Sequence, residues 1–187
     1  MDLLRITSYC WMAMGLYWLL TGFRTKSTIR KEPGARRFAY LILVLLAFAF
    51  VYSRYLSPGF MGKEIFKPSL ISSYAGLIIC ILSVAYAIVA RYWLGNNWSG
   101  TVTVKKNHEL IQNGPYAITR HPIYTGIFLG LSGAALIQAE VKDALAVVLI
   151  FVALEMKMVK EEKFMNETFP GYKEYTKRTK KLIPFIY

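Results

Sequence analysis

The sequence predicts an all-α integral membrane protein with about five transmembrane helices, a helical hairpin near the end and a cytoplasmic C-terminal tail helix. Three observations support this class. Apolar runs recur at the length that crosses a bilayer, the mean hydropathy is +0.36, and the basic residues gather in alternate connecting segments. Because the 187 residues suit one domain, we treat 1–187 as a single membrane-embedded domain.

The N-terminal part of this domain, 1–94, carries three apolar runs. We expect them to span the membrane at 6–23, 38–56 and 70–94. The third run contains small residues that would let a neighbouring helix approach closely. These small residues are Ser72, Ser73, Gly76 and Ser83.

Charge in the connecting segments predicts the orientation. The segment 24–37 holds six basic residues and one acid, whereas 57–69 holds two lysines and one glutamate. Short basic loops face the cytoplasm, because the translocation machinery and the membrane potential retain cations on that side. An odd number of spans then places the N-terminus outside and the C-terminus in the cytoplasm.

The C-terminal part, 95–187, is expected to contain a loop, a helical hairpin and a tail. The polar loop runs from 95 to 120, and 101–104 alternates like a short strand, although an isolated strand pair is weak. Two spans follow at 122–138 and 144–159. Since only five residues join them, they form an antiparallel hairpin. The charged segment 160–187 is typical of an interfacial helix.

A polar stretch precedes the fourth span and is the expected centre of the chemistry. Gly114 and Pro115 signal a turn, and Pro122 suits the first helical position, where an N–H group has no partner. His121 is therefore expected at the N-cap, with Arg120 just outside. A helix N-terminus suits a carboxylate or phosphate, because its N–H groups are free and carry partial positive charge.

The hairpin brings a second polar cluster to the same depth. Its two legs have nearly equal lengths of roughly 24–26 Å at the α-helical rise, so Glu161 and Glu162 return to the level of Arg120, His121 and Tyr124. The cytoplasmic end of the hairpin thus offers basic groups that could bind an anionic group of a ligand, and carboxylates that could bind a cationic group or hydroxyls. S-adenosylmethionine presents that mixture of groups. Purely structural Arg–Glu and His–Glu clamps would explain the same pattern.

A further acid lies deeper in the fifth span. Glu155 is one to two turns inside the membrane, where an acid is costly and is a functional candidate by default. Lys157 and Lys160 are the neighbours expected to pair with it.

Composition excludes other classes. The formal net charge is +12, but the basic residues are divided among segments around membrane spans, so we predict no nucleic-acid partner. Cys10 and Cys80 lie inside apolar runs, so neither a disulfide framework nor a metal site is expected.

Several short motifs follow one another over about 105–185. They are Gly114-Pro-Tyr116, Arg120-His-Pro-Ile-Tyr124-x-Gly126, Glu161-Glu162, Phe169-Pro-Gly171-Tyr172-x-x-Tyr175 and Leu182-Ile-Pro184-Phe. Their order and spacing resemble the isoprenylcysteine carboxyl methyltransferase family and its phospholipid methyltransferase relatives. The resemblance implies an integral membrane methyltransferase that uses S-adenosyl-L-methionine. The cofactor would sit in a cytoplasm-facing pocket, and a lipophilic or prenylated acceptor would enter from the bilayer.

The resemblance also implies roles for individual residues. The expected cofactor-binding residues are Gly114, Pro115, Tyr116, His121, Tyr124, Glu161 and Glu162. The expected catalytic residues are Arg120, Glu162 and Arg178. Arg178 would anchor the acceptor's carboxylate, although Lys180 and Lys181 stand closer to the final motif. Tyr172 and Tyr175 are either ligands or aromatic anchors at the membrane interface.

The expected acceptor is the carboxylate of an isoprenylcysteine-like compound. It is already ionised, so orientation would supply most of the catalysis. The alternative is the amine of a phospholipid, whose proton Glu161 or Glu162 would have to remove. A non-catalytic membrane protein on the same fold is a further alternative. A nicotinamide-dependent reductase would need a larger phosphate-binding surface. The oligomeric state is not predicted.

Overall fold

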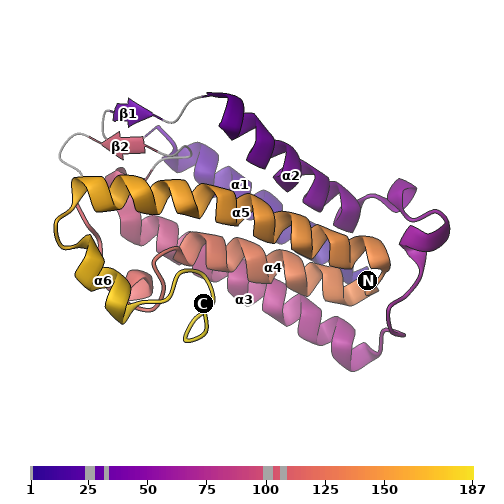
Figure 1. Ribbon diagram of the computed structural model, residues 1–187. Coiled ribbons are helices and arrows are strands. Elements are labelled where there is room, and N and C mark those ends of the chain that lie inside the picture. The colour runs from indigo at the N-terminus through magenta and orange to yellow at the C-terminus, as the bar shows by residue number, and fades with distance from the viewer. Residues whose placement is uncertain (1, 24–27, 32–33, 99–102, 106–108) are drawn as a thin grey trace.

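The computed structural model describes residues 2–23, 28–31, 34–98, 103–105 and 109–187. Long helices dominate it, lie side by side and leave a short helix at one end (Figure 1). The helices are α1 (Leu3–Thr21), α2 (Gly34–Tyr52), α3 (Leu70–Leu94), α4 (Pro122–Gln138), α5 (Val141–Thr168) and α6 (Tyr172–Arg178). Short 3₁₀ turns are η1 (Arg54–Leu56), η2 (Gly59–Gly62), η3 (Gly95–Asn97) and η4 (Gly114–Ala117).

Two helices have the bounds that the sequence predicts, α3 at 70–94 and α4 at 122–138. The prediction for the end of α5 is wrong, because the helix continues to Thr168 rather than ending at 159. Charges signalled a tail there, yet no glycine or proline interrupts the chain before Pro170. The separate tail helix is therefore shorter than predicted and consists of α6 alone.

A small two-stranded ribbon departs from the predicted all-α class. Strand β1 (Thr28–Lys31) pairs antiparallel with β2 (Thr103–Lys105), with Lys31 opposite Thr103. The strand-like alternation at 101–104 lies partly on β2, while 101 and 102 are outside the described residues. The ribbon joins the segments that precede α2 and follow α3, so both lie at the same end of the bundle (Figure 1).

Small residues bring α3 and α4 into close contact, as the sequence predicts for Gly76 and Ser83. A Cβ atom added at Gly133 would lie 2.6 Å from the carbonyl oxygen of Gly76, and one at Gly126 would lie 2.4 Å from that of Ser83. Backbone therefore packs against backbone, which holds the start of α4 firmly. Ser72 has another role, because its hydroxyl completes the N-terminal cap of α3.

The core lies between α2, α4 and α5, and large apolar side chains also cover the outside of the bundle. In the described part of the chain one helix, Leu70–Asn97, is long and apolar enough to cross a bilayer, with shorter apolar helices at Phe38–Tyr52 and Pro122–Gln138. Exposed apolar side chains on α1 and α3 include Met12, Leu16, Leu20, Ile78 and Leu82. Such an apolar exterior suits lipid rather than water.

The hairpin turn between α4 and α5 is fixed by buried charges. Lys142 is 1% exposed, and its Nζ lies 3.2 Å from both Glu140 Oε2 and Asp143 Oδ1. The N–H of Ile65 donates to the carbonyl of Ala139 at 2.7 Å. These contacts tie the turn to the loop after η2, at the end of the bundle opposite the ribbon (Figure 1).

Candidate active site

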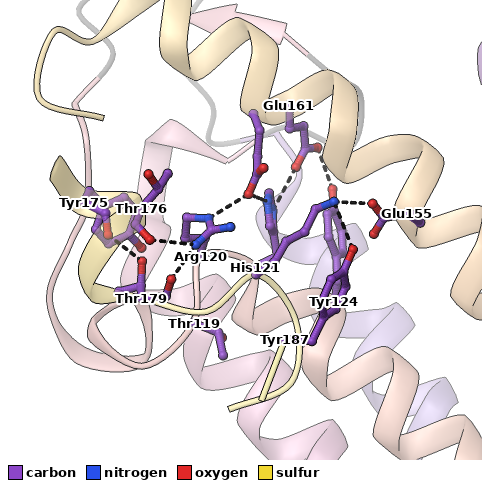
Figure 2. A network of polar contacts seen from close by, with 12 residues as sticks. Thr119, Arg120, His121, Tyr124, Glu155, Glu161, Tyr175, Thr176, Thr179 and Tyr187 are labelled. Carbon is purple, nitrogen blue, oxygen red and sulfur yellow. Dashed lines mark hydrogen bonds and ion pairs between the residues drawn. The ribbon is translucent and has the colours of Figure 1, made fainter. Parts of the chain in front are cut away.

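The backbone that enters α4 is held by the C-terminal tail. His121 occupies the N-cap of α4 and Pro122 the first helical position, as the sequence predicts. The N–H of Arg120 donates to the carbonyl of Lys180 at 2.8 Å, and the N–H of His121 donates to that of Lys181 at 3.2 Å. Because their backbone is fixed in this way, the side chains of Arg120 and His121 both point toward α5 (Figure 2).

The predicted convergence of the two polar clusters is confirmed. Arg120 Nε lies 2.7 Å from Glu162 Oε1. His121 bridges both acids, with Nδ1 3.5 Å from Glu161 Oε2 and Nε2 3.4 Å from Glu162 Oε1. Glu161 and Glu162 lie within the helix rather than at its end, because α5 continues past them.

Tyr124 completes the cluster from the first turn of α4. Its hydroxyl donates to Glu161 Oε1 at 2.6 Å. Its ring stacks on the His121 ring, with centroids 5.5 Å apart and an interplanar angle of 11°. Lys157 Nζ lies 5.0 Å from the centroid of the same ring, within cation–π distance. The side chains of Glu161, His121 and Tyr124 therefore hold one another in place.

The charged forms of these groups stabilise one another. Burial opposes protonation of His121, but Glu161 and Glu162 outweigh it and raise the pKa of the imidazole. Burial likewise opposes ionisation of Glu161, yet His121 and Lys157 lower the pKa of its carboxyl. Burial is again overcome at Glu162, where His121 and Arg120 lower the pKa to about 2. Both carboxylates are therefore ionised at neutral pH and are weak bases.

One nitrogen atom in the cluster, His121 Nε2, makes no hydrogen bond within the described part of the chain. His121 is 7% exposed. The 3.4 Å approach of Glu162 Oε1 is an ion-pair distance without hydrogen-bond geometry. A buried donor left unsatisfied is costly. The site is therefore suited to an anionic or carbonyl oxygen from a ligand.

A cavity of about 550 Å³ opens beside this cluster. Arg120, His121 and Glu161 form a polar part of its wall, and Leu41 and Ile127 belong to an apolar part. Aromatic rings also line it and would cover the flat faces of a ligand. They are Trp18, Trp98, Tyr116, Tyr124, Tyr172 and Tyr175. A cavity of this size, apolar with a few polar groups, is typical of small-molecule and cofactor sites.

The Gly114-Pro-Tyr116 motif shapes the wall of the cavity. Gly114 has a φ of +57°, and a Cβ atom there would lie 2.4 Å from the Trp93 ring, so only glycine fits. Gly114 and Pro115 lie outside the cavity lining, whereas Tyr116 belongs to it. The hydroxyl of Tyr175 donates to the carbonyl of Tyr116 at 2.7 Å. This contact joins α6 to the turn.

Some predicted residues do not line the cavity. Arg178 is exposed and donates to Gln112 Oε1 at 2.8 Å, and it does not line the cavity. Glu162 contacts Arg120 and His121 but does not belong to the lining either.

Glu155 has a partner that the sequence did not indicate. The expectation named Lys157 and Lys160, but the ion pair joins Glu155 to Lys181 of the tail. Sequence reasoning also missed Trp18 and Trp98 in the cavity wall. No spacing signals them, because tryptophan in or beside an apolar run is ordinary and only the packing of the helices reveals the wall.

Comparison with known protein families matches residues 71–171 to the phospholipid methyltransferase family. Among curated proteins, the cobalt-zinc-cadmium resistance protein CzcN of Cupriavidus metallidurans is 30% identical over 58% of this chain and 49% of that protein. The protein-S-isoprenylcysteine O-methyltransferase of Saccharomyces cerevisiae is 31% identical over 68% of this chain and 56% of that protein. The chain thus spans about half the length of these relatives.

A solved structure shares the fold. The eukaryotic intramembrane Ras methyltransferase ICMT superposes with a TM-score of 0.56 and 21% identity, covering 84% of this chain and 55% of that one. The apolar exterior agrees with membrane character. The family match covers more than half of this chain, including the start of α4 and the pair Glu161 and Glu162 of α5. The chain is a helical membrane protein that belongs to the phospholipid methyltransferase family.

Proposed function

We propose that the protein is a membrane-embedded methyltransferase that uses S-adenosylmethionine and acts on a lipophilic acceptor. The observation that carries this proposal is the cluster of Arg120, His121 and Glu161 in the wall of an aromatic cavity of about 550 Å³. Structural clamps alone would explain the ion pairs. They would not explain an aromatic cavity beside them.

The residues of the cavity suit the groups of this cofactor. His121 Nε2 would hold its carboxylate, by charge and hydrogen bonding. Glu161 would hold its ammonium or ribose hydroxyls. Tyr116, with Trp98 among the other rings, would cover the adenine. Gly114 and Pro115, predicted to lie near the cofactor, would act by placing Tyr116.

The bound cofactor would supply an electrophilic methyl group. The chain's contribution is to hold the two reactants in line and to exclude water from them. Arg120 and Lys157, both in the cavity wall, would attract an anionic acceptor. Arg178 was predicted to do so, but it lies on the surface. We therefore propose the anchoring role for Arg120 and Lys157, and Glu162 would orient Arg120 through their 2.7 Å contact.

The electrostatics favour an acceptor that needs no base. A general base works best when its pKa lies near the working pH, and the pKa values of Glu161 and Glu162 are lowered instead. A carboxylate acceptor is already ionised. We therefore propose the carboxylate of an isoprenylcysteine-like compound as the acceptor. A phospholipid amine is the second candidate, which the family match favours.

We also propose that five helices, α1 to α5, span the membrane, with the N-terminus outside and the site at the cytoplasmic end. The ribbon, the start of α4 and α6 all lie at one end of the bundle (Figure 1). Strand β1, which belongs to the basic segment 24–37, lies at that same end. A basic connecting segment marks the cytoplasmic side and supports the assignment.

The test is methyl transfer by the purified protein in lipid nanodiscs, with methyl-labelled S-adenosylmethionine. The acceptors are N-acetyl-S-farnesylcysteine and phosphatidylethanolamine, and Glu161→Gln is compared with the exposed matched variant Glu174→Gln. Labelled farnesylcysteine lost in Glu161→Gln alone supports the proposal. Labelled phosphatidylethanolamine supports the amine candidate instead. No transfer to either acceptor, together with no cofactor binding by the folded wild type, supports the non-catalytic alternative.

A further inference from the structure

After α6 the chain turns back along the bundle. Thr119 and Lys180 form a parallel β-bridge, and the hydroxyl of Thr125, in the first turn of α4, donates to the carbonyl of Leu182. Leu182 itself is fully buried in the core between the helices. The tail therefore does not end at the level of the active site. It continues beside α4, away from the end of the bundle that carries the ribbon.

Aromatic contacts show how far the tail reaches. The Tyr187 ring lies 6.3 Å from the Phe151 ring, which lies 5.9 Å from the Phe128 ring. Phe128 is six residues beyond Pro122, roughly 9 Å along α4, and Phe151 is ten residues before Glu161, roughly 15 Å along α5. Phe151 is also near the middle of the predicted span. The tail thus returns to the depth of the apolar helices.

The backbone of this turn is suited to an apolar medium. The N–H groups of Leu182 and Ile183 donate at 2.7 Å to a backbone oxygen of Tyr187, the last residue of the sequence, and those of Ile186 and Tyr187 donate to the carbonyl of Ile183. Such internal pairing matters in lipid, where water cannot satisfy a free N–H group. Phe185 has a φ of +65°, an uncommon conformation for a residue other than glycine.

In this turn a charged side chain is largely buried and apolar side chains are exposed, which is the reverse of the arrangement expected for a tail in water. The side chain of Lys181 is only 12% exposed, and its ammonium pairs with Glu155 and lies 3.5 Å from the Tyr187 hydroxyl. Phe185 and Ile186 point outward and are 86% and 75% exposed. Two large apolar side chains are thus presented outward at the depth of apolar helices. Water would be unfavourable at this surface, whereas acyl chains fit it.

We propose that 182–187 is a re-entrant turn that anchors the tail in the bilayer, with Phe185 and Ile186 among the lipid acyl chains. The anchor has a consequence for the active site. The carbonyls of Lys180 and Lys181, directly before the turn, accept the N–H groups of Arg120 and His121. Lipid contact at the turn therefore stabilises the backbone that presents the site.

The test places nitroxide spin labels on the full chain in phosphatidylcholine vesicles, in a background with Cys10→Ala and Cys80→Ala. One label is attached to the cysteine of the Phe185→Cys variant. The control label is attached to the cysteine of Lys173→Cys, an exposed position on α6. Electron paramagnetic resonance measures collision of each label with oxygen, which concentrates in lipid, and with a polar nickel complex, which stays in water. The labelled proteins must retain the helical circular dichroism of the unlabelled chain.

The proposal predicts that oxygen dominates at position 185 and that the nickel complex dominates at position 173. Nickel accessibility at 185 equal to that at 173 would overturn it. Exclusion of both reagents at 185 would also overturn it, because a protein partner or second copy would then cover the turn. A label at Ile186→Cys repeats the measurement if the first variant does not fold. Since the readout needs neither cofactor nor acceptor, it is independent of the proposed activity.

Discussion

Replacing Glu162 by glutamine tests the charge cluster by removing one charge at nearly constant volume. Arg120 then loses its 2.7 Å ion pair and His121 one of its two carboxylates. Lowering the pKa of Glu162 from 4.5 to about 2 corresponds to roughly 3 kcal/mol at 1.36 kcal/mol per pKa unit. Because its side chain keeps 20% exposure, we reduce the expected loss of stability to about 2 kcal/mol for solvent screening.

The effect should depend on pH with a definite sign. A carboxyl whose pKa is lowered by folding stabilises the protein fully above its unfolded pKa, here 4.5. That stabilisation is lost as the pH falls through the folded value of about 2. At pH 3.5 it should be smaller by roughly two fifths than at pH 7. The difference in the free energy of unfolding between wild type and Glu162→Gln should therefore be smaller at pH 3.5 than at pH 7.

The assay is unfolding of the detergent-solubilised protein by sodium dodecyl sulfate, followed by circular dichroism at pH 7 and pH 3.5. The control is Glu174→Gln, whose 70% exposed side chain pairs with Lys177 on α6. We expect it to change stability by less than about 0.5 kcal/mol. The reasoning is refuted if Glu162→Gln is no less stable than this control at pH 7, or if acid does not narrow the difference.

Further predictions concern packing and the cavity wall. Gly133→Ala places a methyl 2.6 Å from the backbone of Gly76 and should destabilise by about 1–3 kcal/mol in the same unfolding assay. Gly15→Ala, with nothing within 4 Å, should be neutral or stabilise by up to about 1 kcal/mol; equal effects would contradict the close packing. Tyr175→Phe removes the 2.7 Å bond to Tyr116. It should cost about 1 kcal/mol and weaken cofactor binding in calorimetry; unchanged binding argues against a positioning role for the tyrosine.

Local signals made part of this structure predictable. Pro122 marks the start of α4 and places His121 at its cap, and a short hairpin forces Glu161 and Glu162 back towards Arg120. These inferences need only helix geometry and linker length. The end of α5 was missed because charge alone signalled a tail, whereas helix termination needs a glycine, a proline or a cap.

The remaining features depend on contacts between distant segments. Lys181 reaches Glu155 only because the tail folds back, which no local pattern indicates. Trp18 reaches the cavity because α1 packs beside α3, and Arg178 contacts Gln112 on the surface rather than lining the cavity. The ribbon pairs strands of four and three residues, too short for reliable alternation. Tertiary packing decides each of these positions.

The central claim is that the cavity beside His121 binds S-adenosylmethionine. Isothermal titration calorimetry of the detergent-solubilised protein tests it most directly, with Glu161→Gln and His121→Ala compared with Glu174→Gln. Loss of one hydrogen bond to a charged group should weaken binding at least about tenfold in the first two variants. The control should bind as wild type does. A wild-type protein with native circular dichroism that binds no cofactor, or a folded His121→Ala that binds as tightly as wild type, would contradict the account.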